Sequence, residues 1–387
     1  MAYLNTILSQ LLVHMPRHDF QYLVSHHKAD RYVKRFTTWN QLVTLLYAQA
    51  GDKKSLRDIQ NGLSAHASQL YHLGFAGPAA RSTLADANAT RDWHVFQGLF
   101  KALLERCRSL SPKHKFKFKN PLKTLDSTVI DLCLSMYPWA KFCRTKGALK
   151  LHCMLDHAGN IPTFVVMTDG KCSDLRAVQT GFTPMPDSIY CFDKGYTDFW
   201  FFRRIHERGA FFVTRAKEHM RYRVTGQHPE PKNKAVLADF EIEFMNPSSY
   251  EKCPHRLRLI TFFDAENDRT FEFLTNNFHL SAATIAAIYK ARWQIEAFFK
   301  WIKQNLRIKT FLGTSSNAVQ TQVWVALCYF LLLAYIKFQT KYRFSLFYLH
   351  RLVRETLLER LSLIDLLGLN EARIPKVRDK IQLCFGF

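Results

Sequence analysis

The stretch Tyr289-Lys-Ala-Arg-Trp-Gln-Ile-Glu-Ala-Phe-Phe-Lys-Trp-Ile-Lys303 carries the most informative pattern in this chain. Ser281 is a suitable N-cap and no Gly or Pro follows before Gly313, so the sequence predicts one continuous helix. At about 100° per residue, four of its polar side chains fall within roughly 60° of one another: Tyr289, Arg292, Glu296 and Lys303. This polar stripe borders an apolar one instead of lying opposite it, as charges on a surface helix usually do. A carboxylate flanked by cations and a tyrosine suits a metal ion bound to a phosphate.

The same four residues carry a family resemblance. Their spacing, Tyr-x2-Arg-x3-Glu-x6-Lys, resembles the signature of the DDE transposases of bacterial insertion sequences. Within that family it is similar to the branch that moves by cut-and-paste and has a β-rich insertion before the glutamate. The family also has two aspartates at strand ends, and the blocks 125–128 and 192–199 match them. The resemblance covers most of the chain and is strongest over residues 124–303.

The resemblance implies three catalytic carboxylates that also bind metal: Asp126, Asp193 and Glu296. Three carboxylates at one point repel one another unless a cation neutralises them, so this arrangement implies a divalent metal. Oxygen ligands favour Mg²⁺ or Mn²⁺ over zinc. Two such ions, about 3.5–4 Å apart, can hold the attacking and leaving oxygens of an in-line phosphoryl displacement.

The resemblance also implies DNA-binding residues around these carboxylates. Arg292 and Lys303 resemble the phosphate-binding cations of the signature, and Tyr289 would donate its hydroxyl to the DNA backbone. Trp293 would stack on a base displaced from the duplex during DNA hairpin formation, and Lys194 is a further candidate for DNA binding. The alternatives are a solvated helix face for the cations and a partly buried core position for the tryptophan.

Each catalytic aspartate has a rival nearby in the sequence. Asp131 competes with Asp126, and their odd separation places them on opposite faces of a strand, so only one reaches a cleft. Asp198 competes with Asp193 and has the position of a helix N-terminal residue. Without the family, Asp126 could equally be a turn or capping residue. The resemblance selects Asp126 and Asp193.

The charge of the chain indicates a polyanionic partner. Fifty-four Lys and Arg against 32 Asp and Glu give a formal net charge of +22 over 387 residues. Nucleic acid is the commonest such partner, because neutralised phosphates release condensed counterions. An anionic membrane surface is the next alternative. The remaining alternative is a soluble basic protein that has no polyanionic partner.

Little in the sequence favours a membrane or a secreted protein. The longest apolar run, residues 323–336, is too short to span a bilayer and is typical of a buried helix. Nine cysteines occur without a C-x-x-C pair, which argues against a disulfide framework and for a reduced compartment. We expect a bacterial cytoplasmic protein associated with the nucleoid and not with a membrane.

The organisation of the chain resembles an interrupted ribonuclease-H-like fold, in the α/β class. The order of three strands, helix, strand, helix, strand predicts a mixed five-stranded sheet flanked by helices. We expect a helical N-terminal DNA-binding domain (1–110), a basic linker (111–123), the first part of the core (124–216), a β-rich insertion (217–280), the second part of the core (281–340) and a C-terminal helical region (341–387). Within the first domain, helices over residues 55–63 and 80–89 form a candidate DNA-reading module, with Arg81, Ser82 and Thr83 at the start of the second.

The main hypothesis is a DNA transposase that binds the terminal inverted repeats of its own insertion sequence and transfers them into target DNA. Cutting two ends together implies at least a homodimer, with residues 345–361 as a candidate contact. Two alternatives share parts of this pattern. A stand-alone nuclease on the same fold would use the metal site without joining strands, and a DNA-binding repressor would not need the carboxylates.

Overall fold

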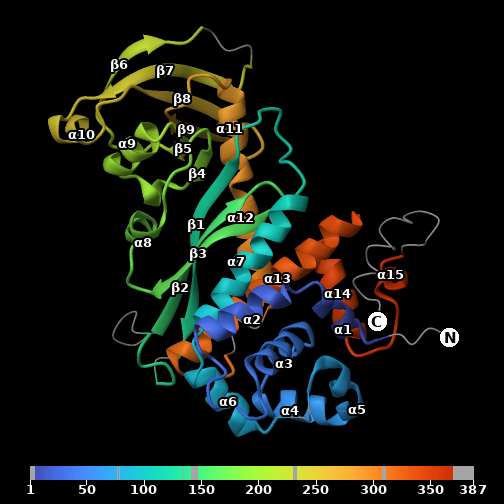
Figure 1. Ribbon diagram of the computed structural model, residues 1–387. Helices are drawn as coiled ribbons and strands as arrows, with labels where there is room; N and C mark the ends of the chain where they lie inside the picture. The colour runs from blue at the N-terminus through green and yellow to red at the C-terminus, as the bar shows by residue number, and fades with distance from the viewer. Residues whose placement is uncertain are drawn as a thin grey trace. The chain divides into compact units, whose positions relative to one another are not determined.

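The computed structural model describes residues 5–75, 77, 79–133, 135–140, 147–229, 233–306 and 311–368 (Figure 1). The chain forms two compact units. The helical unit comprises residues 1–112, 131–139 and 300–387, and the sheet unit comprises residues 113–130 and 140–299. Each unit has a core of its own.

The helical unit is built around one long apolar helix. Its helices are α1 (Ile7–Val13), α2 (Arg17–His26), α3 (Thr38–Ala50), α4 (Leu56–Ala65), α5 (Ala67–Leu70), a 3₁₀ turn η1 (Tyr71–Leu73), α6 (Arg81–Thr90), α7 (His94–Leu110), α13 (Ser316–Thr340), α14 (Leu346–Thr356) and α15 (Leu363–Leu366). Helix α13 packs against α3, α6, α7 and α14. The predicted helical character of the first 110 residues agrees with the structure. The part of the C-terminal region beyond residue 368 lies outside the described residues.

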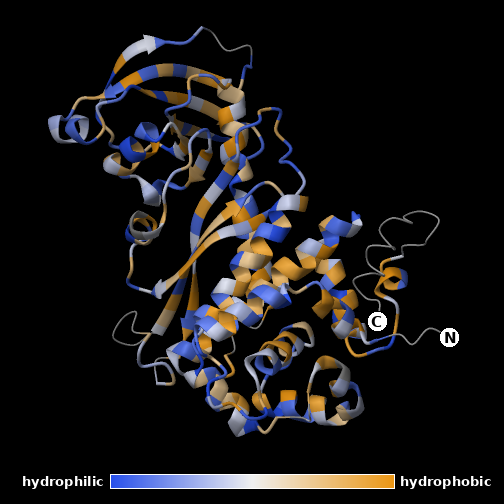
Figure 2. Cartoon of the chain, in the orientation of Figure 1, coloured by the Kyte–Doolittle hydropathy of each residue, from blue (hydrophilic) through white to orange (hydrophobic). Residues whose placement is uncertain are grey.

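Helix α13 is longer than the sequence predicts. It runs for 25 residues from the N-cap Ser315, because the polar residues before the apolar run are also helical. The expectation that this segment is too short to span a membrane is therefore wrong, since α13 is long and apolar enough by length and composition. Of its most apolar 18-residue window, 89% is buried inside the protein. It is coloured as strongly hydrophobic in Figure 2, and it occupies the core of the helical unit, as predicted for a buried helix.

The sheet unit contains one nine-stranded mixed sheet with the order β3-β2-β1-β4-β5-β9-β8-β7-β6. The strands are β1 (Leu122–Leu132), β2 (Gly147–Asp156), β3 (Ile161–Asp169), β4 (Ile189–Phe192), β5 (Phe211–Arg215), β6 (Tyr222–Gln227), β7 (Val236–Phe244), β8 (Leu257–Asp264) and β9 (Arg269–Thr275). Strands β1, β4 and β5 are parallel neighbours, whereas β2 and β3 pair antiparallel. The first five positions contain the five expected strands.

The sheet has nine strands instead of five because the strands of the expected insertion join its edge. Strand β9 pairs antiparallel with β5, with Val213 opposite Thr275, and β8, β7 and β6 follow in turn. An unpaired β5 edge would leave a row of backbone donors and acceptors without partners, and β9 satisfies them. Figure 1 shows β6 to β9 continuing the sheet beyond β5.

Both faces of the sheet are covered, so strand β4 is buried on both sides. Ile189 and Cys191 pack in one core with α11 (Ala282–Ala291), and Tyr190 and Phe192 pack in the other with α9 (Phe199–Glu207). Helix α8 (Asp174–Gly181) contributes to this second core through Val178. A strand buried on both faces reads as a continuous apolar run, which is why the sequence predicts β4 well.

The helix predicted from residue 281 to beyond 303 is interrupted at Arg292. Helix α11 ends at Ala291 and α12 (Trp293–Asn305) begins two residues later, with only Arg292 between them. The Arg292 N–H donates to the Tyr289 carbonyl at 3.1 Å, and the Ile295 N–H donates to the Arg292 carbonyl at 3.1 Å. Each of these hydrogen bonds joins residues three apart in the sequence, as in a 3₁₀ helix, whereas those of an α-helix join residues four apart. No Gly or Pro marks the interruption in the sequence.

A buried ion pair joins the added strands to the start of α11. The Arg258 guanidinium donates to both carboxylate oxygens of Asp239, at 2.8 and 2.6 Å, and both side chains are 5% exposed. The same guanidinium donates to the carbonyls of Asn277 and Leu280, at 3.2 and 2.6 Å. Since α11 begins at Ala282, this one side chain fixes β7, β8 and the chain entering α11.

We expect Arg258→Ala to lower the free energy of unfolding by about 3–5 kcal/mol, because it leaves a buried carboxylate without a counter-charge. Arg223→Ala is the matched control, since Arg223 pairs with Glu243 on the neighbouring strands but its side chain is 65% exposed. The control should lose less than about 1 kcal/mol. Urea denaturation of both variants measures the difference, and equal losses would contradict the assignment.

Candidate active site

Two adjacent parallel strands bring the first two predicted carboxylates together. Leu125 of β1 lies opposite Phe192 of β4, so Asp126 and Asp193 are the next residues in the same register. The Asp193 carboxylate accepts the Gly195 N–H at 2.9 Å and so starts a 3₁₀ turn, η2 (Lys194–Tyr196). This turn ends β4, so the Asp193 side chain lies directly beyond the last residue of the strand.

Arg292 joins Asp126 to the third predicted carboxylate. Its guanidinium donates to the Asp126 carboxylate at 2.8 Å and to the Glu296 carboxylate at 2.7 Å. The three side chains are 12%, 19% and 35% exposed, respectively, so the pair with Asp126 is the better shielded. Strand β1 and the start of α12 are thus connected through one cation. The interruption of the helix at Arg292 lies at this connection.

The electrostatics of Asp126 show that the three acidic groups share one neighbourhood. Burial, together with the nearby charges of Asp193 and Glu296, raises the pKa of Asp126 to about 6. The Ser127 N–H and the Arg292 guanidinium act in the opposite direction but do not outweigh burial. A carboxyl group surrounded by like charges and low polarity holds its proton unless a cation is close.

The donor set fits a hard divalent cation by chemistry. Asp126, Asp193 and Glu296 offer only carboxylate oxygens, which Mg²⁺ and Mn²⁺ prefer. Over the ranges that the structure describes, no three His, Cys, Asp or Glu side chains are already grouped as a metal site. The Arg292 guanidinium supplies positive charge to two of the three carboxylates.

The two rival aspartates have other positions. Asp198 caps α9, with its carboxylate accepting the Phe201 N–H at 2.8 Å, as the sequence predicts for a helix N-terminal residue. Asp131 lies near the end of β1, exposed, in the part of the strand that belongs to the helical unit. Neither is among the charges that shift the pKa of Asp126.

The predicted DNA-binding residues have different environments. Trp293 is 64% exposed, so the alternative of a core tryptophan is wrong. Tyr289 is half-buried and packs against Phe273 with ring centroids 5.0 Å apart. Lys194 forms an exposed ion pair with Glu218 at 3.6 Å. Lys303 is half-buried on α12, in the helical unit.

A cavity of about 630 Å³ lies in the sheet unit beside these residues. Tyr289, Arg292 and Trp293 line it from α11 and α12, and aromatic and cationic side chains line it from the sheet: Arg215, Phe262, Phe271 and Phe273. The sequence alone did not predict the side chains of the second group. Phe271 and Phe273 are two residues apart on β9, which predicts that both lie on the same face of the sheet. The sequence does not predict which helix covers that face, because this depends on the pairing of β9 with β5.

Asp174 is a further acidic residue that the sequence analysis missed. Its carboxylate lies 3.0 Å from the Lys150 amine and 3.2 Å from a ring nitrogen of His152. Burial acts to raise the pKa of Asp174, but hydrogen bonds from His152, Ser127 and Lys150 outweigh it and hold that pKa below its usual range. Asp174 thereby orients Ser127, the residue next to Asp126.

Comparison with known proteins finds two domain families in the chain. The family described as transposase DDE domain matches residues 118–332, and a domain family of unknown function, DUF4372, matches residues 4–76. A Sinorhizobium fredii protein described as a transposase, y4zB, is 35% identical over 259 residues, covering 65% of this chain and 69% of the relative. A Geobacillus stearothermophilus protein described as a transposase for insertion sequence element IS5377 is 28% identical over 262 residues, covering 67% of this chain and 68% of the relative.

A solved structure is also similar. It is the cryo-EM structure of the piggyBac transposase synaptic complex with hairpin DNA, at 10% identity and a TM-score of 0.44. The similarity covers 97% of this chain and 84% of that one.

We expect Arg292→Ala to lower the free energy of unfolding by about 2 kcal/mol at pH 7.5, because two carboxylates lose a charged hydrogen-bond donor. The loss should be smaller at pH 5. The pKa of Asp126 is raised to about 6, so ionisation of this carboxyl group lowers the stability of the folded protein as the pH rises toward and through that value. At pH 5 the group is mostly protonated and needs no counter-charge, so removal of Arg292 costs less there. Urea denaturation at both pH values measures this.

The matched control for this pH dependence is Arg203→Ala. Arg203 pairs with Glu207 one turn away on α9, at 2.7 Å, where both side chains are more exposed. This variant should lose no more than about 0.5 kcal/mol. A loss for Arg292→Ala that is the same at pH 5 and pH 7.5 would rule out the coupling to Asp126.

Proposed function

This chain belongs to the DDE transposase family of insertion sequences, and we propose that it cuts and joins DNA at the ends of its own element. Family membership gives DNA transposition as the activity and DNA as the partner. The observation that carries the finer proposal is that Arg292 joins Asp126 to Glu296 while the charge of Asp193 also acts on Asp126. These three carboxylates are the proposed catalytic residues.

The proposed core is ribonuclease-H-like. Strands β3, β2, β1, β4 and β5, with helices on both faces, support this assignment. It is also supported by Asp126 within β1, Asp193 directly after β4 and Glu296 on α12, although Asp126 lies in the middle of its strand and not at the end that the resemblance implies. Asp126, Asp193 and Glu296 would hold the Mg²⁺ or Mn²⁺ ions. Two ions bound there supply Lewis-acid activation of the attacking water or 3′-hydroxyl and stabilise the leaving oxygen.

The protein residues around the carboxylates would position the DNA backbone. Arg292 is the proposed phosphate-binding cation closest to the reaction, and Tyr289 would donate its hydroxyl to the backbone. Lys303 on α12 and Lys194 beside Asp193 are further proposed contacts. Because Arg292 bridges two carboxylates in the structure, a phosphate that binds it competes with Asp126 and Glu296 for the same donors.

The cavity beside Arg292 supports the proposed hairpin step. The first cut would free a 3′-hydroxyl that attacks the opposite strand and joins the two strands in a hairpin. The hairpin turns so tightly that a base has to leave the duplex. Trp293 is exposed at the cavity and the aromatic side chains of β8 and β9 line its other side, which provides stacking surfaces for a displaced base. Opening of the hairpin by water would precede strand transfer into target DNA.

The proposed assembly is a homodimer that holds two element ends. The helical N-terminal region (1–110) would bind the terminal inverted repeats, and the basic linker (111–123) would follow a phosphate backbone. Helix α14 falls within the predicted contact 345–361, and it exposes Phe347 and Tyr348, at 44% and 48%. We place this activity in the bacterial cytoplasm, at the nucleoid, without a role for a membrane.

We expect wild-type protein with Mg²⁺ to cleave a duplex at the boundary of the element's terminal repeat, and Glu296→Gln to abolish cleavage while binding persists. Loss of one carboxylate weakens the metal site without removing the DNA contacts. A gel assay with end-labelled duplex measures both. Asp131→Asn is the matched control and should keep full activity, since Asp131 is exposed and outside the site.

The same assay separates the alternatives. A stand-alone nuclease would release cleaved ends that never join a target plasmid, and a repressor would bind the duplex without cutting it. Activity that Asp131→Asn removes but Glu296→Gln leaves intact would overturn the carboxylate assignment.

We expect Trp293→Ala to reduce the rate of hairpin formation by roughly 5- to 150-fold, because base stacking on an aromatic ring contributes about 1–3 kcal/mol. The first-strand nick should persist, since it needs no displaced base. Denaturing gels distinguish nicked from hairpin products. Trp200→Ala is the matched control, because Trp200 on α9 is also exposed, at 50%, but does not line the cavity. Equal loss of both products in Trp293→Ala would contradict the stacking role.

A further inference from the structure

The loop between α2 and α3 presents a cluster of cations at the surface of the helical unit. Four basic side chains in it are exposed: Lys28, Arg31, Lys34 and Arg35. Across the described part of the chain, the structure pairs none of the four with a carboxylate within 4 Å. Exposed cations of a folded surface usually have mixed-sign neighbours, so four such charges within eight residues point to an anionic partner.

The backbone of this loop is held in place from both sides. Asp30 accepts the Thr38 N–H at 2.7 Å and its hydroxyl at 2.6 Å, which ties the loop to the start of α3. On the other side, the Arg91 guanidinium donates to the Phe36 carbonyl and to the Gln41 side chain. The exposed cations therefore project from a fixed frame.

Two residues of the loop have left-handed backbone conformations that ordinary side chains rarely adopt. Lys28 has φ 51° and Tyr32 has φ 64°. Tyr32 is 86% exposed, and the Arg31 guanidinium lies 4.9 Å above its ring. A bulky residue in this conformation costs stability, and such strain is found where surrounding contacts impose it, often at functional sites. Nothing in the core requires the Tyr32 side chain.

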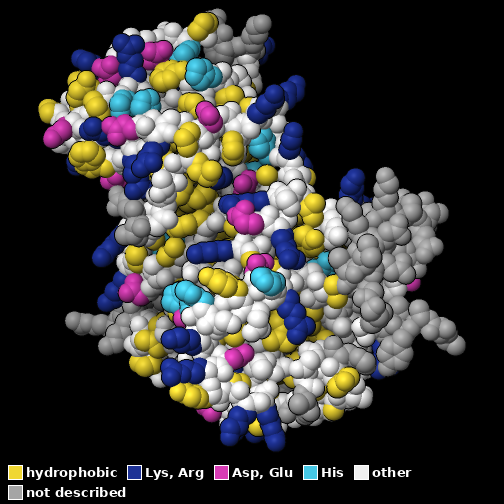
Figure 3. All heavy atoms as spheres, viewed as in Figure 1, with side chains coloured by type: hydrophobic (Ala, Val, Ile, Leu, Met, Phe, Trp, Pro, Cys, Tyr) yellow, Lys and Arg dark blue, Asp and Glu magenta, His cyan; other side chains and the backbone are white. Residues whose placement is uncertain are grey.

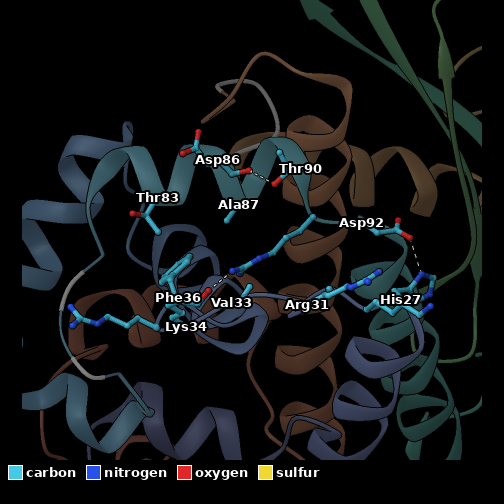
Figure 4. Close-up of a pocket in the computed structure, with 14 residues that line it drawn as sticks. His27, Arg31, Val33, Lys34, Phe36, Thr83, Asp86, Ala87, Thr90 and Asp92 are labelled. Carbon is cyan, nitrogen blue, oxygen red and sulfur yellow. Dashed lines mark hydrogen bonds and ion pairs between the residues drawn. The ribbon is translucent and has the colours of Figure 1, made fainter.

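The loop forms one wall of a groove of about 820 Å³, and α6 forms the other (Figure 4). From α6, Thr83 points toward the loop, whereas the Asp86 carboxylate points away from it and the Thr90 hydroxyl donates to the Asp86 carbonyl at 2.7 Å. In the close-up, Lys34 and Arg31 extend in opposite directions along the loop. Five cations line the groove against two carboxylates, one of which, Asp92, is engaged by His27 at 2.8 Å and His94 at 2.6 Å. Figure 3 shows Lys, Arg and His side chains gathered over this part of the helical unit.

We propose that this groove is a binding site for the phosphate backbone of duplex DNA. Lys28, Arg31, Lys34 and Arg35 contact phosphates, Thr83 offers a hydroxyl donor from α6, and Tyr32 packs on the sugar or base beside them. The inference rests on the proposed function, because it identifies a surface that would hold the element's DNA. It differs from the helix pair predicted from the sequence, since the cations come from the loop before α3.

The test measures how DNA affinity depends on salt. The full chain with Glu296→Gln, in EDTA, binds a fluorescent duplex that ends in the terminal repeat, and anisotropy gives Kd between about 50 and 200 mM salt. Lys34→Ala/Arg35→Ala should make the slope of log affinity against log salt shallower by about 1.8, since each phosphate contact contributes about 0.9. Lys101→Ala/Arg108→Ala, two exposed cations of α7 outside the groove, should leave the slope unchanged.

A second variant distinguishes a loss of DNA binding from a loss of stability. Tyr32→Gly relieves the left-handed strain, so its melting temperature should stay equal or rise while its DNA affinity falls at least threefold. Tyr22→Ala removes another exposed tyrosine, from α2, and should keep full affinity.

The outcomes separate this proposal from the proposed function. If the parent protein binds the repeat and both groove variants bind with its slope and affinity, the groove assignment is overturned and the transposase function stands. If the double variant instead loses binding to anionic phospholipid vesicles while its DNA slope is unchanged, the groove binds a membrane and the proposal also fails. If the parent binds no duplex, the proposed function itself is wrong.

Discussion

The guanidinium of Arg292 is the interaction on which the arrangement of the site depends. Asp126 and Glu296 come from a strand and a helix that are 170 positions apart in the sequence, and one cation donates to both. Without it, the buried carboxylate of Asp126 would face only like charges from Asp193 and Glu296. The fold can therefore keep Asp126 close to Glu296 because it places one permanent positive charge between them.

The sequence predicts the parts of this site that local pattern determines. The apolar run of β4 marks the strand before Asp193, and the sequence position of Asp198 predicts the N-cap role that it has in α9. The interruption at Arg292 was not predictable, because its tight hydrogen bonds follow no Gly or Pro. The sequence also did not predict which strands pair with each other. Whether β9 joins β5 or forms a separate sheet depends on contacts between distant segments.

The union of β9 with β5 changes what the added strands do. Because they continue the sheet, Phe271 and Phe273 face α11 and help to form the cavity beside Arg292, instead of the core of a detached module. The Arg258–Asp239 pair then fixes the segment that enters α11. Helix α11 is thus held at its start by the added strands and at its end, through Arg292, by Asp126.

Two kinds of cation act in this chain, and they differ in their response to salt. Arg292 is mostly shielded from solvent and close to its partners, so salt screens its interactions weakly. The loop cations Lys28, Arg31, Lys34 and Arg35 are exposed, so their attraction to phosphates declines steeply as counterions compete. Salt should therefore release DNA before it disturbs the carboxylates. In the proposed complex, exposed charge would hold the DNA and shielded charge would hold the acidic groups in place, so salt would remove the DNA before it disturbs the site.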